Sequence, residues 1–541
     1  MASIHRLSVD DRVMLWPDAL WPQEVAALAI LDGTNLLDSD GRLRLDKVRA
    51  MIGSRLYLVP RLRQLLYRPR RGLGGPLWVD APSFDLAQHV LSVPVPPPGD
   101  EAALLSAVER LRRQRLDPTR PLWLMCLLTG LPNQQLGLFV KIHHAVTDGV
   151  AALATVGAFL DTAPDFRAAS PAAIPSPTAA ALDPADPADP TEPAATPEPM
   201  ATIESAATPD SAVASVPSWR PEPWPTTVQL VADNARRHAV SLWQMAATLA
   251  HPVATARWLR AAWSQMRTFS SGPADPPSSL DHPLTADRRL ALVRASLGQV
   301  AETAHTNGAT INDVLLAATT GGLRALLHAR GEPADHPVNI DVPITLRPKE
   351  SRDRARGNKI AQMLIALPVY EADPMRRLEL IAAQTSLGKR ESRPSAGRML
   401  GSRLARRFVV KALRRHPVNV TSADLTGPAQ PVYLAGARVL EVFPMLPLMG
   451  NICLGVGALS CAGQFTIGVI ADRDAYPDLD VFTAALRAEL TEFGEPAGPA
   501  AADRTSAVPV GGGAVIAASL AQGGHRRDPA VAPRASRTPH L

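Results

Sequence analysis

The segment 136–160 constrains the fold of this 541-residue chain more than any other stretch. Up to His144 it alternates residues between two faces, with the period of two that is typical of a β-strand. From residue 150 onward it follows an apolar helical pattern. Thr147 and Asp148 both carry side chains that can accept hydrogen bonds from the first N–H groups of a helix. The sequence therefore predicts a strand–turn–helix corner, with one of these two residues capping the helix.

Two adjacent histidines, His143 and His144, lie at the tip of this corner. Neighbours in a strand point to opposite faces, so only one of them can serve a given cavity. An imidazole titrates near neutral pH and can remove a proton from a hydroxyl or amine that attacks an acyl group. We expect no metal site, because the two side chains diverge and no HExxH helix is present. The plain alternative is that the two histidines only fill core or surface space.

The corner reads His143-His144-Ala145-Val146-Thr147-Asp148-Gly149 and resembles the HHxxxDG signature of the CoA-dependent acyltransferase superfamily. Further motifs resemble one branch of it, the bacterial bifunctional wax ester synthase/diacylglycerol acyltransferases. The family's PLW, ND and C-terminal motifs are matched in order by Arg120-Pro121-Leu122-Trp123, Thr310-Ile311-Asn312-Asp313-Val314 and Tyr433-Leu434-Ala435-Gly436-Ala437-Arg438-Val439. Other matches lie at 84–90, 342–348 and 357–359.

The resemblance implies an α/β fold of two chloramphenicol-acetyltransferase-like mixed-sheet domains with an active-site tunnel between them. It implies that His144 is the catalytic base and that His143 is structural, a choice that the alternation of the strand also favours. Asp148 is expected to orient the corner through an arginine. Gly149 is expected to leave room for substrate beside the base. No cofactor is expected, and acyl-CoA is the expected co-substrate.

The ND motif has two interpretations. Asn312 could supply a hydrogen bond to an oxyanion or fix a loop. Equally, Asn312 and Asp313 could do no more than cap the helix that the pattern predicts over 311–327. Both interpretations treat the two residues as substrate-binding or structural support, and neither makes them the base.

Pro121, Leu122 and Trp123 are expected to shape the scaffold rather than to react. Proline fixes a turn, and tryptophan fills apolar space. Cys126 could in principle carry an acyl group, but nothing in the sequence suggests a base beside it. Direct transfer between the two substrates is therefore the favoured mechanism.

Composition divides the chain into four parts. Residues 1–163 mix strand and helix patterns and are predicted to form the N-terminal acyltransferase domain that carries the corner. Residues 226–496 resume this mixture and are predicted to form a C-terminal acyltransferase-like domain with the ND motif. Residues 164–225 are rich in Ala and Pro and are predicted to be a disordered linker, and 497–541 a disordered tail.

Charge and hydropathy exclude several classes of protein. The formal charge of +5 suits anionic CoA or an acidic membrane surface, and no nucleic-acid-binding motif is present. No apolar run approaches the length of a spanning helix, and no secretion signal precedes the first domain. The three cysteines lie in apolar runs, which fits a reducing compartment. We therefore expect a cytoplasmic protein that associates peripherally with a membrane or with lipid bodies.

Two segments are candidates for contact with lipid. Residues 230–266 carry Trp243, Trp258 and Trp263 among arginines, and 398–415 repeat apolar residues at four-residue spacing between arginines. The alternative for such a segment is a helix packed on the core with a solvated cationic face.

The function that the family resemblance implies is O-acyl transfer. A long-chain acyl group would move from acyl-CoA to diacylglycerol, giving triacylglycerol, or to a long-chain alcohol, giving a wax ester. Two alternatives stay open. One is a condensation-type acyltransferase that uses carrier-protein thioesters. The other is a non-catalytic lipid-binding or droplet protein, which the departure from the family pattern after Asn419 keeps in play.

Overall fold

The computed structural model describes residues 4–164, 219–249, 278–345, 360–390 and 418–493. Some sequence predictions lie outside these residues. They are most of the linker at 164–225, the tail at 497–541, the segment 398–415, the match at 357–359, and Trp258 with Trp263.

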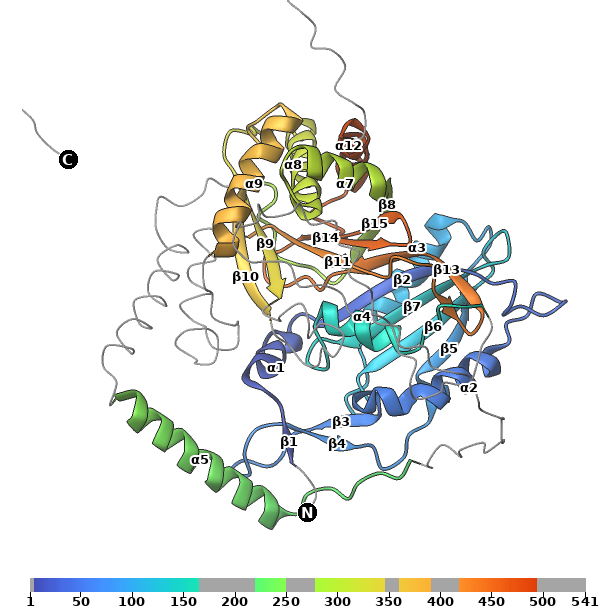
Figure 1. Cartoon of the computed structure of the whole chain (residues 1–541), viewed down its shortest axis with the longest axis vertical. Coiled ribbons are helices and arrows are strands. Elements are labelled where there is room, and N and C mark those ends of the chain that lie inside the picture. Colours follow the sequence, from blue (N-terminus) through green and yellow to red (C-terminus); the bar gives the residue numbers. More distant parts are fainter. Residues whose placement is uncertain (1–3, 165–218, 250–277, 346–359, 391–417, 494–541) are drawn as a thin grey trace, which may run out of the picture. The chain divides into compact units, whose positions relative to one another are not determined.

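Two six-stranded sheets organise the described residues (Figure 1). The first, named here the histidine sheet, has the strand order β12-β13-β2-β7-β6-β5. Its neighbours are antiparallel, except that β5 and β6 are parallel. Its strands are β2 (Glu24–Asp32), β5 (Val90–Pro94), β6 (Trp123–Thr129), β7 (Gln135–His143), β12 (Tyr433–Leu434) and β13 (Ala437–Met445).

The second sheet, named here the C-terminal sheet, has the order β10-β9-β11-β14-β15-β8. Strand β11 is parallel to both of its neighbours, and the other pairs are antiparallel. Its strands are β8 (Arg288–Ser296), β9 (Val338–Thr345), β10 (Ile360–Leu367), β11 (Val420–Thr426), β14 (Leu454–Cys461) and β15 (Gln464–Asp472). Both sheets are mixed, so the predicted α/β class with mixed sheets is confirmed.

Helices cover these sheets because their apolar faces pack on alternate strand residues. The C-terminal sheet and its helices share one large core, to which α8 contributes Val314 to Ala318 without a break. Its helices are α7 (Leu297–Thr306), α8 (Ile311–Ala329), α9 (Pro374–Arg390) and α12 (Leu479–Glu492). In the first part of the chain the helices are α1 (Val9–Met14), α2 (Leu45–Arg55), α3 (Glu101–Arg113) and α4 (Gly149–Gly157).

A small third sheet is formed early in the chain. Its order is β1 (His5–Arg6), β4 (Leu77–Asp80) and β3 (Gln64–Tyr67), with antiparallel pairing. Helix α5 (Thr227–Leu249) attaches to it through Leu230, which is buried with Leu77 and Val79. None of the helices in the described residues is both long enough and apolar enough to cross a bilayer.

Most predicted elements are confirmed, and one is wrong in its second half. The residue pattern of the sequence predicts strands at 26–31, 122–128, 338–344, 360–367 and 465–470 and helices at 101–114, 150–160 and 311–327, and all of these are present. The pattern also predicts a single helix over 45–66, but that helix ends at Arg55. Two short 3-10 turns follow, Leu56–Leu58 and Pro60–Arg63. Pro60 explains the stop, because proline lacks an N–H and disfavours helical geometry in the residue before it.

Strand β13 joins the two sheets. It pairs with β2 of the histidine sheet, although it lies some 400 residues later in the chain, and its Pro444 lies against Gly457 of β14. A Cβ atom at Gly457 would come within 2.9 Å of the Pro444 carbonyl oxygen, so glycine permits this close approach. The predicted domain boundaries stay a prediction, but β12 and β13, from the predicted C-terminal domain, belong to the histidine sheet.

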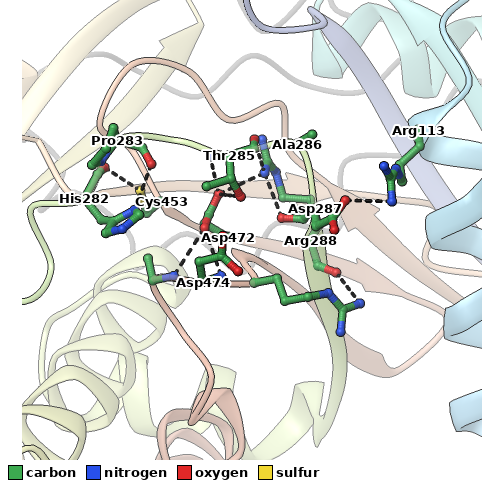
Figure 2. A network of polar contacts seen from close by, with 12 residues as sticks. Arg113, His282, Pro283, Thr285, Ala286, Asp287, Arg288, Cys453, Asp472 and Asp474 are labelled. Atoms are coloured by element: carbon green, nitrogen blue, oxygen red, sulfur yellow. Dashed lines mark hydrogen bonds and ion pairs between the residues drawn. The ribbon is translucent and has the colours of Figure 1, made fainter.

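A buried carboxylate forms a polar clamp between α3 and the C-terminal sheet (Figure 2). Asp472 is fully buried and accepts hydrogen bonds from the N–H and the hydroxyl of Thr285, at 2.6 and 2.8 Å. Its oxygen Oδ2 also lies 3.1 Å from Nη1 of Arg288. The N–H of Arg288 donates to Glu109 of α3 at 3.0 Å, and Asp287 pairs with Arg113 at 2.7 Å. The segment 285–288 is thus held from both sides.

The replacement Asp472→Asn should lower the free energy of unfolding by about 3 kcal/mol, because it leaves the buried Arg288 guanidinium without its anion. Urea denaturation checks this value. The control is Asp474→Asn at a neighbouring exposed carboxylate, which should change stability by no more than about 0.5 kcal/mol. Equal effects of the two variants would contradict the assignment of Asp472 as the anchor.

Strand β9 carries a second buried carboxyl group, Asp341. Burial alone raises the pKa of Asp341 to about 7. Its side chain accepts a hydrogen bond from Nε2 of Gln362 at 3.3 Å. The folded protein therefore holds a proton at Asp341 at pH values where the unfolded chain releases it.

Stability should consequently fall as the pH rises from about 4 to about 7, because the folded-state pKa of Asp341 lies above the unfolded one. The variant Asp341→Asn cannot ionise. The free energy of unfolding of the variant minus that of the wild type should therefore be larger at pH 8 than at pH 4 by roughly 4 kcal/mol. Urea titrations of both proteins at the two pH values measure this difference. A constant difference across the range would contradict the raised pKa.

Candidate active site

The histidine corner has the predicted strand–turn–helix form. Strand β7 ends at His143, His144 lies in the turn, and α4 begins at Gly149 with Asp148 as its N-cap. The strand separates two apolar cores, with Ile142 on one side and Phe139 on the other. This burial on both sides holds the strand in register, because a slip by one residue would exchange its two faces.

The ring of His143 is buried, and both of its nitrogens are engaged within the protein. The N–H of Ala145 donates to Nδ1 of His143 at 3.0 Å. Because Nδ1 accepts a hydrogen bond, the ring proton must lie on Nε2. Nε2 in turn lies 3.2 Å from Oδ1 of Asp18. These contacts leave neither nitrogen of His143 for a substrate.

Asp18 holds this arrangement from a segment far away in the sequence. Its Oδ1 also accepts the N–H of Gln23 at 3.0 Å, and its Oδ2 lies 3.3 Å from Arg115. Burial raises the pKa of Asp18, but the hydrogen bonds from His143 and Gln23 and the charge of Arg115 outweigh this effect. The net result is a lowered pKa, so Asp18 is an anion at neutral pH.

The backbone of the turn is fastened on two sides. On one side, the N–H of His144 donates to the carbonyl of Gln23 at 2.7 Å. On the other side, the N–H of His143 donates to the carbonyl of Leu122 at 3.0 Å. Within the turn, the N–H of Val146 donates back to the carbonyl of His143 at 2.8 Å. The half-buried side chain of His144 is therefore presented by a rigid backbone.

Trp123 anchors the neighbouring strand in the core. Its indole N–H donates to the carbonyl of Leu62 at 2.8 Å, and its ring stacks on His89 with centroids 4.7 Å apart. His89 stacks on Phe84 in turn. Burial lowers the pKa of His89, which keeps this ring neutral within the stack. Pro121, Leu122 and Trp123, the PLW motif, are all buried. The motif meets the corner through the carbonyl of Leu122, which accepts the N–H of His143, and through a shared apolar core.

Asp148 and Gly149 form the start of helix α4. Asp148 is buried, and its Oδ1 accepts the N–H of Ala151 at 2.9 Å, so it caps α4 and adds a negative charge at the positive end of the helix. The arginine expected to pair with Asp148 stays a prediction. A Cβ atom at Gly149 would lie 3.6 Å from the side chain of Leu425 in β11, an ordinary contact distance. Protein packing alone does not require glycine there, and the expected room for substrate stays a prediction.

The two residues of the ND motif, Asn312 and Asp313, have different surroundings. Asp313 forms a capping box with Thr310, accepting its N–H and its hydroxyl at 2.8 Å each. Its other oxygen accepts the hydroxyl of Thr385 in α9 at 2.7 Å. Capping is thus the role that the structure shows for Asp313. Asn312 lies half-buried in the first turn of α8, and its amide has no hydrogen-bond partner within the described residues. Its proposed contact with an oxyanion stays a prediction.

Two other chemistries receive no support from the geometry. Burial raises the pKa of Cys126 to about 11, so this thiol is a poor nucleophile at neutral pH. In the part of the chain that is described, no three His, Cys, Asp or Glu side chains are grouped so that they could hold a metal ion.

Sequence reasoning missed Asp18 and Gln23, the two residues that fasten the turn from the N-terminal segment. Nothing in a local pattern could have found Asp18, because its partner lies 125 positions further along the chain. His89 does lie in a segment that matched the family, but only the stack with Trp123 reveals why.

Family models match most of this chain. Residues 7–315 match the wax ester synthase/diacylglycerol acyltransferase catalytic domain, and residues 356–493 match the C-terminal domain of the same family. A protein of Mycobacterium tuberculosis (strain H37Rv), named a probable diacylglycerol O-acyltransferase, is 27% identical over 465 residues, which are 84% of this chain and 87% of the relative.

Solved structures are similar in fold. The wax ester synthase/diacylglycerol acyltransferase of Marinobacter aquaeolei VT8 has a TM-score of 0.58 and 21% identity, covering 90% of this chain and 98% of that one. The starter condensation domain of rhizomide synthetase, solved with C8-CoA, has a TM-score of 0.54 and 15% identity, covering 91% and 94%. These likenesses show the fold, and the matched domain models show the family. The chain belongs to the wax ester synthase/diacylglycerol acyltransferase family.

Proposed function

We propose that this protein transfers a long-chain acyl group from acyl-CoA to the hydroxyl of diacylglycerol or of a long-chain alcohol, with His144 as the general base. Membership of the family and the names of its relatives support the reaction class. The observation that carries the choice of base is the engagement of both His143 nitrogens by Asp18 and Ala145. Because these contacts give His143 a structural role, we propose His144 as the member of the pair that acts as the base.

The proposed reaction is a direct transfer. His144 takes the proton of the acceptor hydroxyl while the oxygen attacks the thioester carbonyl. The tetrahedral intermediate then expels CoA as a thiolate, which receives that proton from His144. General-base help of this kind contributes about 10²–10⁴-fold to the rate. No metal or cofactor is proposed, and acyl-CoA is the acyl donor.

Other residues of the corner would support this step. Asp148 would hold the start of α4 beside the base, and Asn312 would donate a hydrogen bond to the oxyanion. The substrates would meet in a tunnel where the corner, at Gly149, faces Leu425 of the C-terminal sheet. Excluding water there would protect the thioester from hydrolysis.

Both acceptors are lipids, so the proposed place of action is a lipid surface. We propose a cytoplasmic protein that associates peripherally with a membrane or with lipid bodies. This association would deliver diacylglycerol or alcohol to the site, while acyl-CoA arrives from the aqueous phase.

The test of the reaction uses purified protein and labelled palmitoyl-CoA, with dioleoylglycerol and hexadecanol offered in parallel. Labelled triacylglycerol or wax ester identifies the acceptor. If a folded protein formed no ester while the thioester stayed intact, the proposal would fail. The condensation-type and lipid-binding alternatives would then be tested with carrier-protein thioesters and with lipid binding.

The variant His144→Ala should lower kcat by about 10²–10⁴-fold, because the acceptor hydroxyl loses its base. Melting temperature and circular dichroism should stay close to those of the wild type, since only the half-buried side chain is removed. The control is His336→Ala at an exposed histidine, which should keep full activity. Wild-type kcat in a folded His144→Ala protein would exclude this residue as the base.

Asp18 should act as a positioning residue. We expect Asp18→Ala to lower kcat about tenfold or more with little change in the KM for acyl-CoA, because the tautomer of His143 and the turn behind it lose their anchor. Asp18→Asn keeps an oxygen that can accept from Nε2 and should restore most of the rate. The ¹⁵N chemical shifts of His143 report the tautomer directly. An unchanged kcat in Asp18→Ala would refute the positioning role.

A further inference from the structure

Helix α5 is attached to the protein by its polar face. Asp233 is buried and lies 2.8 Å from Nε of Arg6 in β1. Asn234 donates to the carbonyl of Gly72 at 3.0 Å, and Leu230 is buried in the small apolar cluster of the three-stranded sheet. Figure 1 shows the helix extending away from this sheet. The described contacts therefore hold the helix near its N-terminal end, through one side.

The opposite side of α5 is apolar and exposed. At about 100° per residue, Val228, Val231, Leu242 and Trp243 fall on one stripe, roughly opposite to Leu230 and Asp233. Val228 is 78% exposed, Leu242 is 62% exposed and Trp243 is 72% exposed. A helix on a globular protein normally turns its apolar stripe toward the core. Here the stripe faces outward, so it is available to another apolar surface.

Arginines lie beside and behind this stripe. At about 100° per residue, Arg236 falls at its edge and Arg237 falls on the attached side, where it pairs with Asp233. The segment 227–249 contains one acidic residue, Asp233, and Arg236 and Arg237 beside it are exposed by 75% and 50% of their side chains. The loop between β3 and β4 adds three exposed arginines, Arg68, Arg70 and Arg71, and residues 64–79 contain no acid. This loop contacts α5 through Gly72.

Arg6 fixes the loop and the helix relative to each other. Besides its ion pair with Asp233, its guanidinium donates to the carbonyls of Leu73 and Gly75. The loop therefore wraps around the same cation that anchors α5. The exposed stripe of α5, with Arg236 at its edge, and the exposed arginines of the loop that holds the helix are together named here the α5 patch.

We propose that the α5 patch rests on a bilayer that contains anionic phospholipid. Leucine, valine and tryptophan side chains would enter the interface, and the arginines would contact lipid phosphates. A second copy of this chain is a poorer occupant, because pairing the patch with itself would bring the arginines of both copies together. The inference deepens the proposed function by naming the surface that meets lipid, and binding can be measured without any acyl transfer.

Vesicle sedimentation of the full-length protein tests the proposal. One set of vesicles contains phosphatidylcholine alone, and the other contains equal parts of phosphatidylcholine and phosphatidylglycerol. The wild type should bind the anionic vesicles and be released by salt. The double variants Leu242→Glu/Trp243→Glu and Arg70→Glu/Arg71→Glu should each weaken this binding by roughly tenfold or more. The matched control is Leu387→Glu, a leucine of α9 that is 65% exposed, and it should bind like the wild type.

Three outcomes would overturn the inference. If all variants bound vesicles as tightly as the wild type, the α5 patch would not be the surface that contacts the membrane. Loss of binding in Leu387→Glu as well would show a general effect of added charge. A shift from dimer to monomer in ultracentrifugation of the α5 variant, with vesicle binding intact, would assign the patch to a second copy. Acyl transfer is assayed separately in detergent micelles. Vesicle binding that depends on the patch would stand even if no ester formed there.

Discussion

The hydrogen-bonded ring of His143 is the constraint on which the candidate site depends. A buried imidazole must satisfy two nitrogens, and here an anion takes one and a backbone N–H of the turn takes the other. This pairing defines the tautomer, and the tautomer defines the shape of the turn that carries His144. The first histidine of the motif thus serves the second by holding its backbone in place. The two adjacent histidines thus differ in their surroundings, because the ring of His143 is fixed by Asp18 and Ala145 while the turn carries His144.

The turn also draws together three distant parts of the chain. Its partners come from the N-terminal segment at Asp18 and Gln23 and from Leu122 before β6. At Gly149 the turn also approaches the C-terminal sheet, since a Cβ atom there would lie 3.6 Å from Leu425. These segments lie close to the corner in space, although none of them is adjacent to it in the sequence. A site of this kind is the product of the whole fold, because no one element could hold the turn alone.

The parts that could be predicted from sequence are those governed by local rules. The alternation of β7, the capping of α4 by Asp148 and the capping box at Asp313 follow from residue types at fixed short spacing. The early end of the helix at Arg55 could also have been predicted locally, because Pro60 lies inside the range 45–66 that was predicted as one helix. Contacts between residues that are far apart in the sequence have no such local signal. The ion pair of Arg6 with Asp233, the contact of Asp18 with His143 and the outward apolar face of α5 depend on tertiary placement, which periodicity cannot supply.

The position of β13 has a consequence for how the molecule is made. The histidine sheet contains β2 from the start of the chain and β13 from near its end, and the two are direct neighbours. During synthesis, β2 can pair with β7 early, but its other neighbour, β13, is complete only when the ribosome has added residue 445. The N-terminal part therefore emerges with an unpaired strand edge, which is a template for wrong pairing. The histidine sheet can therefore be completed only after residue 445 of the 541 has been translated, so its folding is a late event.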